Sequence, residues 1–374
     1  MDTGKTHLAS LDSLRGVGVI LIFANHFIYP IPYILFGWIG LWIFFALSGF
    51  LITDGLLKMK ALPVGHYFGR FYAKRAFRIL PAFVVFFTIS VALYFAFQHG
   101  FPGAPSLGRY WIYIVTFTFN YYPTPGTFWF DHLWSLSLEE QFYVVWPWLV
   151  FFLPMKWLKR IAPCWILVAP VLRLILPQTW LLCQADALAI GGCVAIFRDK
   201  LPRQSKKLMW MMTAAVIVIG LVNYFTGASA AGPYWQTLGW NVGVINYQYV
   251  WGFSVINLWA ATLILACLQG TAPTFLNFTP LVFLGRISYG AYLSHVPLLG
   301  VYYYYLQPIN AFSIRGFAIF VIWFANVIFI SWLSFRFIEL PFLRIKNRLG
   351  RQKRVAARTE QLCTLPPVKR AAQE

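Results

Sequence analysis

The sequence contains little charge for its length. Only 11% of its 374 residues are Asp, Glu, Lys or Arg, and 60% are hydrophobic, whereas a soluble domain averages about 25% charged residues. This composition excludes an ordinary soluble protein. Acidic residues are the scarcest class, with 11 against 30 basic ones and a net charge of +19. Because the basic residues stand between apolar segments, we interpret them as determinants of membrane orientation and expect no nucleic-acid partner.

Other common features are also missing. The chain has only five cysteines, without paired metal-ligand spacing, so we expect neither a disulfide framework nor a metal site. No Walker loop, dinucleotide fingerprint, G-x-S-x-G elbow or HExxH helix occurs, which argues against the soluble enzyme classes that these motifs mark. No internal repeat is visible, and this weakens a transporter built from inverted repeats.

Long apolar segments are what the chain does contain. A helix needs about 20 mainly apolar residues to cross a bilayer. Segments of this kind are 11–29, 35–57, 80–97, 132–153, 161–178, 181–197, 208–225, 250–268, 284–305 and 314–338. We therefore predict an all-α polytopic membrane protein, a bundle of about ten transmembrane helices that forms one domain over 1–342. The basic clusters fall on one side if both termini are cytoplasmic, with 343–374 as a basic, disordered cytoplasmic tail.

One further stretch, 109–122, would disturb this alternation if it crossed the membrane. It is rich in Trp and Tyr, and these residues favour the headgroup zone of a bilayer. We expect it to be an interfacial or re-entrant piece.

The first apolar segment carries three polar groups, Asp12, Arg15 and His26. Arg15 and His26 are 11 positions apart, which places them on nearly the same helix face with a rise of roughly 16 Å between them. Ionisable groups inside a bilayer are costly and usually functional. Arg15 alone is equally compatible with a cation that reaches the membrane surface, whereas His26 favours a functional role.

A second polar group lies at the start of the fourth segment. His132, Ser135 and Glu139 are spaced three and four apart and share one helix face. The adjacent Glu140 points to a different face, so the two carboxylates are not a paired acid and base. A hydrated polar cluster at the membrane surface is the simpler alternative to a functional site.

A third group, Lys74, Arg75 and Arg78, precedes the third segment, where Pro81 suits a first helical turn. One face can present several of these cations to a phosphate, although membrane orientation alone would also explain them.

Weaker signals occur elsewhere. Arg173 and Asp186 suggest an ion pair between neighbouring helices, and Arg336 with Glu339 suggests a second pair or a ligand site. Ser288, Tyr292 and His295 make a polar start to the ninth segment.

In chain order, these residues resemble the motifs of membrane acyltransferase family three, whose members acylate bacterial surface polysaccharides. Arg15 through His26 is similar to the family's Arg-x10-His pattern, and the segment around Ser48 to its Phe-x-x-Ser-Gly-Phe pattern. The basic box resembles Arg-Arg-x-x-Arg-Ile-x-Pro, with Lys74 in place of the first arginine, which keeps the charge but loses bidentate geometry. The remaining similar motifs are His132 to Tyr143, Asp186 with Gly191, Ser288 to Pro297, and Glu339 with Pro341.

The resemblance implies an O-acyltransferase of the bacterial inner membrane that moves an acyl group, on family grounds acetyl, from cytoplasmic acyl-CoA to a sugar hydroxyl. The acceptor would be an exopolysaccharide, another surface glycan or a lipid-linked precursor. Partners would be membrane lipid, the glycan and polysaccharide-biosynthesis proteins. The SGNH-type domain that some members carry after the spans is not expected here.

Within that expectation, Lys74, Arg75 and Arg78 would bind the CoA phosphates, and His26 would act as general base or accept the acyl group itself. Arg15 would hold a donor group or stabilise the oxyanion, and Glu139 would orient His26 or contact the acceptor if its helix packs beside the first one. Asp12, Ser48, His132, Glu140, Ser288, Tyr292, His295 and Glu339 would bind substrate or support the site. The main rival is a transporter or flippase of lipid-linked sugars; a lipid-linked glycosyltransferase and the other large membrane O-acyltransferase family fit less well.

Overall fold

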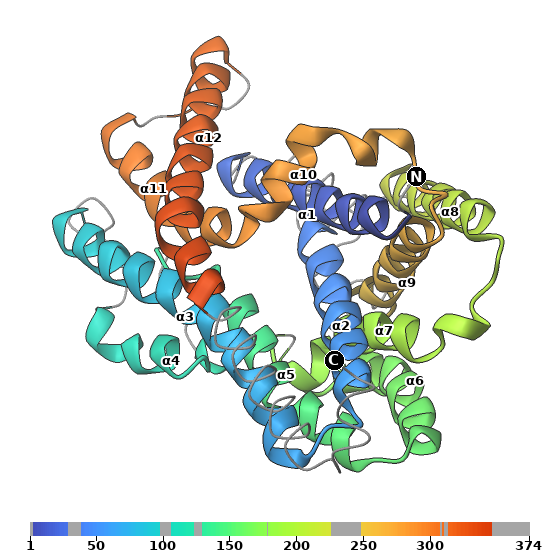
Figure 1. The fold of residues 1–374 in the computed structure, drawn as a ribbon. Helices are drawn as coiled ribbons and strands as arrows, with labels where there is room; N and C mark the ends of the chain where they lie inside the picture. Colours follow the sequence, from blue (N-terminus) through green and yellow to red (C-terminus); the bar gives the residue numbers. More distant parts are fainter. Residues whose placement is uncertain are drawn as a thin grey trace.

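The computed structural model describes residues 3–28, 39–97, 106–122, 129–177, 179–225, 248–306, 309 and 313–345. Over these residues the chain forms helices joined by turns, without a strand (Figure 1). The helices are α1 (Thr3–Ile28), α2 (Ile39–Met59), α3 (Val64–Phe97), α4 (Trp111–Val115), α5 (Leu133–Phe152), α6 (Met155–Leu172), α7 (Leu181–Ile196), α8 (Ser205–Phe225), α9 (Gln248–Leu268), α10 (Thr279–Arg286), α11 (Ser288–Leu306) and α12 (Ile314–Ser334). The all-helical prediction is therefore confirmed for the described residues.

Each of the ten predicted segments overlaps a helix. Five helices of the described part are long and apolar enough to cross a membrane: α2, α3, α8, α9, and α12 with its extension to Ile345. The protein is thus a multi-pass membrane protein, whereas ten crossings and cytoplasmic termini stay predictions. Residues 343–345 belong to the last helix, and the rest of the predicted tail lies outside the described residues.

Helix α3 corrects the predicted start of the third segment. It begins at Val64 instead of residue 80, and Pro81 lies inside it rather than in its first turn. Proline removes one backbone hydrogen bond, but membrane helices tolerate this where neighbouring helices pack around the break. The basic residues Lys74, Arg75 and Arg78 consequently project from a continuous helix that also enters the membrane.

Two more boundaries differ from the predicted ones. The ninth segment is two helices, α10 and α11, separated at Ile287. The last segment does not end at residue 338, because a π-helical turn at Phe335–Glu339 leads into further helix that reaches Ile345. The break at Ile287 contains no proline, and the charges of the π-helical turn, Arg336 and Glu339, did not indicate that turn.

Glycine brings two helix pairs into backbone contact. A Cβ atom on Gly49 of α2 would lie 1.9 Å from the carbonyl oxygen of Leu188 in α7, and one on Gly191 would lie 1.9 Å from that of Ala46. In the same way, a Cβ on Gly285 of α10 would lie 1.7 Å from the carbonyl oxygen of Asp12 in α1. Small residues allow membrane helices to approach this closely. The pairs α2–α7 and α1–α10 form a rigid frame for the polar groups of α1 and α2.

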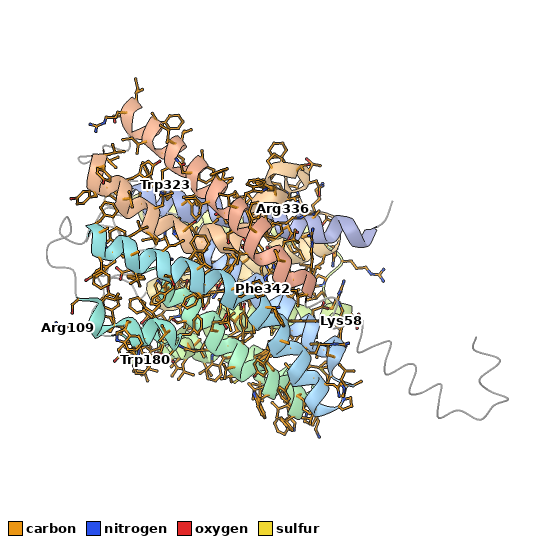
Figure 2. All side chains as sticks on the ribbon, turned by 60° about the vertical axis from the view of Figure 1, so that its left-hand side comes forward. Lys58, Arg109, Trp180, Trp323, Arg336 and Phe342 are labelled. Atoms are coloured by element: carbon orange, nitrogen blue, oxygen red, sulfur yellow. The ribbon has the colours of Figure 1, made fainter. Side chains whose placement is uncertain are left out.

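The stretch 109–122 forms no membrane-spanning helix. Its longest helix, α4, has 5 residues and is about 7.5 Å long, against a hydrocarbon thickness of about 30 Å. The stretch 109–122 packs on α5, where the Gln141 amide donates to the Phe117 carbonyl at 2.8 Å. In Figure 2, Arg109 and Trp180 lie near one end of the bundle and Lys58 lies toward the opposite end.

The predicted ion pair between neighbouring helices is present. Arg173 Nη2 lies 2.5 Å from Asp186 Oδ1, and both side chains are fully buried. Arg173 Nε also donates to the Cys183 carbonyl at 2.8 Å, and Ser254 Oγ donates to Asp186 Oδ2 at 3.1 Å. The pair therefore ties α6, α7 and α9 together.

Candidate functional site

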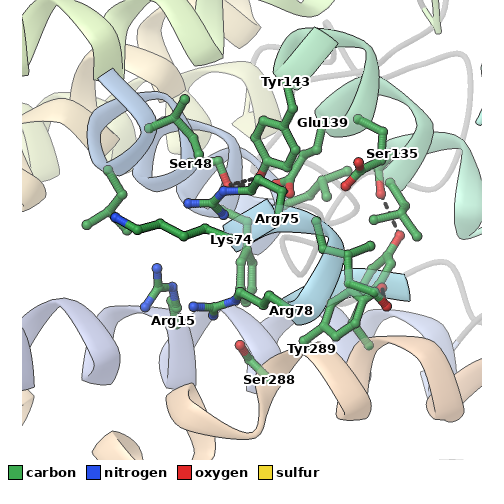
Figure 3. Close-up of a pocket in the computed structure, with 18 of the residues that line it drawn as sticks. Arg15, Ser48, Lys74, Arg75, Arg78, Ser135, Glu139, Tyr143, Ser288 and Tyr289 are labelled. Carbon is green, nitrogen blue, oxygen red and sulfur yellow. Dashed lines mark hydrogen bonds between the residues drawn. The ribbon is translucent and has the colours of Figure 1, made fainter. Parts of the chain in front are cut away.

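A cavity of about 450 Å³ lies between α1, α2, α3, α5 and α11 (Figure 3). We call it the cationic cavity. Its lining is Arg15, Leu41, Phe44, Ser48, Leu51, Ile52, Gly55, Lys74, Arg75, Arg78, Ile79, Ser135, Leu136, Glu139, Glu140, Tyr143, Ser288, Tyr289 and Tyr292. It brings together candidates from five separate sequence motifs: the Arg15 helix, the Ser48 segment, the basic box, the segment that follows His132 and the segment that begins at Ser288.

Four cations face this space. Arg15 comes from α1, and the three residues of the basic box come from one face of α3, as their spacing predicted (Figure 3). The guanidinium carbon of Arg75 lies 5.2 Å from the Tyr143 ring centroid, and its Nε is buried without a hydrogen-bond partner among the described residues. A buried donor without a partner is costly, so Arg75 is suited to bind an anionic oxygen inside the cavity.

Two carboxylates face the same space in different surroundings. Glu139 accepts hydrogen bonds from Ser48 Oγ and from the Tyr143 hydroxyl, each at 2.9 Å. Glu140 Oε1 is buried without a hydrogen-bond partner in the described part of the chain. The cavity is therefore strongly ionic, with an excess of positive charge.

The expected link between Glu139 and His26 is not formed. Helix α5 packs mainly on α2 and α7 and on the short turn Phe119–Tyr121, not beside α1. The hydrogen bonds of Glu139 go to Ser48 and Tyr143, and the carboxylate lines the cationic cavity while His26 lies elsewhere. Packing of α5 against α2 was not visible in the sequence. Glu139 makes no hydrogen bond to His26 in the described structure, and its role in the reaction stays a prediction.

Asp12 supports Arg15. Its Oδ1 accepts from Arg15 Nη1 at 2.8 Å, and its Oδ2 lies 3.7 Å from Arg286 Nε. Asp12 does not line the cavity. It holds the Arg15 side chain in place along α1, so its role is to position Arg15.

A second cavity, of about 270 Å³, adjoins the first. We call it the histidine cavity. Its lining is Ile22, Asn25, His26, Leu41, Trp42, His132, Trp134, Ser135, Thr179, Gln184, Phe253 and Tyr292. Arg15 and His26 thus share α1, as predicted, but face two different spaces.

The hydrogen bond of His26 decides which ring nitrogen is available. Its Nδ1 lies 2.9 Å from the carbonyl oxygen of Ile22. A carbonyl oxygen can only accept, so Nδ1 carries the proton and the lone pair of a neutral ring is on Nε2. This is the arrangement that a general base requires.

Three histidines gather at this place. The ring of His295 lies 4.9 Å from that of His26 and 5.1 Å from that of His132, measured between centroids. His295 is fully buried, stacks on Phe23 and has Nδ1 2.6 Å from the Tyr292 carbonyl. His295 does not line either cavity, so it supports the two histidines that line the second one. In the described residues no group of three or more His, Cys, Asp or Glu could hold a metal ion.

The two cavities share a wall of Leu41, Ser135 and Tyr292. Ser135 Oγ and the Tyr292 hydroxyl are 2.5 Å apart, and Tyr292 also donates to the carbonyl of His132. The predicted face of α5 runs across this wall, because His132 lines one cavity, Glu139 the other and Ser135 both. This shared face is confirmed.

Two remaining candidates lie at the edge of the cationic cavity. Ser288 lines it. Glu339 is buried beside Gly290 and Ser334 and interacts electrostatically with Arg78. Arg336 is exposed and forms no ion pair with Glu339 in the described structure, so this alternative is wrong.

Several lining residues were not predicted. Trp134 and Tyr143 belong to the segment that carries Glu139, and their helical spacing could have indicated them. Thr179, Gln184 and Phe253 come from parts of the chain without a functional motif. Only the packing of α7 and α9 brings them to the site.

Comparisons with known proteins agree with the resemblance. A family model described as "Acyltransferase domain" matches residues 8–336. No solved structure matches the chain.

Curated relatives include peptidoglycan O-acetyltransferase OatA of Listeria monocytogenes, at 26% identity over 90% of this chain and 56% of the relative. O-acetyltransferase OatA of Staphylococcus aureus is 25% identical over 90% of this chain and 57% of the relative. Putative peptidoglycan O-acetyltransferase YrhL of Bacillus subtilis is 27% identical over 90% and 55%. The chain therefore spans little more than half the length of these relatives.

Proposed function

The chain belongs to the acyltransferase family whose domain model it matches, and on that premise we propose that it moves an acetyl group from acetyl-CoA to a sugar hydroxyl. The observation that carries the proposal is the pair of adjoining cavities, which have different linings and one common wall. A transferase needs a donor site and an acceptor site that meet at the point where the group is transferred. The cationic cavity would receive the donor and the histidine cavity the acceptor.

The cationic cavity suits the donor because CoA carries phosphates. Arg75 and Arg78 would bind them with charge-assisted hydrogen bonds, and Lys74 would add a point charge. Arg15 lines the same cavity, which favours a donor-binding role for it over an oxyanion role. The thioester would then lie toward the Ser135–Tyr292 wall, next to the histidine cavity.

The chemical step follows from the tautomer of His26. Nε2 takes the proton of the sugar hydroxyl while the hydroxyl oxygen forms a bond to the acetyl carbonyl carbon. The carbon–sulfur bond breaks, its electron pair stays on the CoA sulfur, and the thiolate then receives the proton from His26. The products are an acetylated sugar and free CoA, and His26 returns to its starting state.

The acceptor would be a surface glycan or its lipid-linked precursor. Two of the relatives are named as peptidoglycan O-acetyltransferases, one of them putative, so peptidoglycan is the first acceptor to test. We propose the bacterial inner membrane as the location, with lipid and polysaccharide-biosynthesis proteins as neighbours. A flippase would need no histidine as a base, and no relative named above is a transporter.

The test is acetyl transfer from radiolabelled acetyl-CoA to glycan in membranes that hold wild type, His26→Ala or His66→Ala at equal amounts. His66 is exposed at the start of α3 and serves as the matched control. Label that appears with wild type and His66→Ala but not with His26→Ala supports the proposal. Equal label with His26→Ala removes His26 as the base, and label that stays on the protein without acceptor indicates an acyl-enzyme.

A further inference from the structure

We infer that the histidine cavity is the acceptor subsite and that it holds a single uncharged pyranose ring. The inference rests on the proposed function and deepens it, since it states which class of sugar enters the site. It is carried by the contrast in charge between the two cavities, by the size of the second cavity and by its polar and aromatic lining.

The first argument is charge. The cationic cavity is lined by four cations and two carboxylates, whereas no Asp, Glu, Lys or Arg of the described residues lines the histidine cavity. A buried anion is stable only beside a cation or several donors. A uronic acid, a sialic acid or a sugar phosphate would find no charged partner here, whereas a neutral sugar needs none.

A carboxylate that interacts with His26 strengthens this selection. Asp131 precedes His132 and interacts electrostatically with His26, although its side chain is not part of the lining. A carboxylate at this position would stabilise His26 after it takes a proton and would repel an anionic sugar. The site therefore disfavours acidic acceptors in two ways: the carboxylate repels them, and the lining offers no cation to bind them.

The second argument is size. A cavity of about 150 Å³ holds one benzene molecule, so the histidine cavity, at about 270 Å³, has space for roughly twice that volume. One pyranose ring with its hydroxyl groups is of this size. A disaccharide is too large to be enclosed, so the neighbouring sugars of a polymer would lie outside the cavity.

The third argument is the chemistry of the walls. Trp42, Trp134 and Phe253 supply aromatic surface, with Trp42 and Phe253 stacked at 4.6 Å and 19°. Aromatic rings are large, apolar and rigid, and the C–H face of a pyranose packs well on them. Phe253 covers one face of the Trp42 ring. We therefore assign Trp134, which is half-buried, as the platform on which the pyranose ring packs.

Neutral hydrogen-bonding groups complete the lining. Asn25, Thr179 and Gln184 present amides and a hydroxyl, and His132, only 4% exposed, has no described side chain bonded to its ring nitrogens. A site with such groups favours ligands that carry hydroxyls, because an apolar ligand would leave the ring nitrogens of His132 without a hydrogen-bond partner. His132 would bind a hydroxyl next to the one that His26 deprotonates.

The experiment compares neutral acceptors with an acidic one. Wild-type protein in lipid nanodiscs receives radiolabelled acetyl-CoA with methyl β-D-glucuronamide, methyl N-acetyl-β-D-glucosaminide or methyl β-D-glucuronide, and with isolated peptidoglycan as a fourth acceptor. The glucuronamide and the glucuronide both lack the C6 hydroxyl and differ in the charge at C6, so this pair isolates the effect of charge. We expect label in one or both neutral glycosides and at least tenfold less in the glucuronide. Labelled peptidoglycan with no labelled neutral glycoside, or equal label in the glucuronide, overturns this inference and leaves the proposed function standing. No label in any acceptor contradicts both.

A charge-gain variant tests the same idea through the ratio of two activities. Thr179 is exposed at the cavity wall and donates to the Asn120 carbonyl at 2.8 Å, and Thr179→Lys would place a cation there. We expect the ratio of glucuronide to neutral glycoside acetylation to rise about tenfold, since close opposite charges are worth this much or more. Thr116→Lys is the control, because Thr116 also bonds one carbonyl, that of Ile112 at 2.6 Å, but does not line the cavity. An unchanged ratio in Thr179→Lys, or the same change in both variants, overturns the inference.

Trp134→Ala separates the binding role from a structural one. We expect the KM for the neutral glycoside to rise about tenfold while the KM for acetyl-CoA stays unchanged, and Trp134→Phe to recover most of the loss. A shift of both KM values together, or no shift of either, contradicts the assignment of Trp134 as the platform.

Discussion

The two cavities are built from the same helices but have opposite chemistry. Helices α1, α2, α5 and α11 contribute to both, yet one cavity has six acidic or basic side chains and the other has none. The difference arises partly from position along α1, since Arg15 and His26 lie at different depths, and partly from α3, which lines only the cationic cavity and carries three of its four cations. It teaches that helices shared by two cavities can give them different charge, and under the proposed function this separates an anionic donor from a neutral acceptor.

The largest expected effect concerns the base of the histidine cavity. His26→Ala should lower kcat for acetyl transfer by about 100- to 10,000-fold, the usual contribution of a general base, and leave acetyl-CoA affinity unchanged because the donor binds in the other cavity. Initial rates and equilibrium binding of labelled acetyl-CoA measure the two quantities. Loss of acetyl-CoA binding in this variant would show that the two cavities do not act separately.

The next effect concerns the buried ion pair between Arg173 and Asp186. Asp186→Asn should lower the free energy of unfolding by about 3–5 kcal/mol, since it leaves the buried Arg173 without its charge partner. Thermal unfolding followed by tryptophan fluorescence in detergent measures the change. Asp54→Asn is the control, because Asp54 pairs with Lys58, whose side chain is 67% exposed, and should cost less than about 1 kcal/mol. Equal losses in the two variants would contradict a stabilising role for the buried pair.

A smaller effect is expected for the donor. Arg75→Ala should raise the KM for acetyl-CoA by about 10- to 100-fold, since hydrogen bonds to charged groups contribute about 1.5–3 kcal/mol, and leave the KM of the glycan unchanged. Arg75→Lys should recover part of this loss because the charge is kept without the planar donor group. Arg70→Ala, on the same helix but outside the cavity, should behave as wild type. A raised glycan KM in Arg75→Ala would place the acceptor in the cationic cavity instead.

The smallest effect concerns Tyr292, in the wall that the two cavities share. Tyr292→Phe removes the hydroxyl that bonds Ser135 and the His132 carbonyl, and should lower kcat by about 3- to 10-fold, the value of one or two neutral hydrogen bonds. Both KM values should stay within twofold, roughly, if the wall acts only on the transfer step. Tyr302→Phe, on the same helix, loses a bond from Asn326 Nδ2 at 2.9 Å and serves as control. A change in acetyl-CoA KM alone would assign Tyr292 to the donor site.

The sequence predicted those parts of the site that lie on single helices. The face shared by Arg15 and His26, the basic face of α3 and the line from His132 to Glu139 each follow from helical spacing within one segment. The buried Arg173–Asp186 pair was also predicted, because two opposite charges in neighbouring apolar segments have few other partners. The start of α3 was not predicted, because the basic stretch 64–79 was interpreted as a connection that precedes the span. The break at Ile287 was not predicted, since apolar content does not locate a helix end inside a continuous hydrophobic stretch.

The residues that were missed lie far apart along the chain. Thr179, Gln184 and Phe253 have no functional motif around them and reach the histidine cavity only through the packing of α7 and α9 on α2. The same reason explains the missing link between Glu139 and His26, since the neighbours of Glu139 depend on which helix packs against α5.

The sequence by itself determined that this protein is a helical membrane protein and which helix faces carry ionisable groups, because hydrophobic length and 3.6-residue periodicity are local properties. Its motifs resemble those of the acyltransferase family, to which the match over residues 8–336 assigns it. Only the tertiary structure decided that those faces enclose two cavities instead of one, and that His26 and Glu139 lie in different ones. Close approach of α2 to α7 and of α1 to α10 at glycine determines which faces meet. Such contacts join residues more than a hundred positions apart, and no local pattern in the chain specifies them.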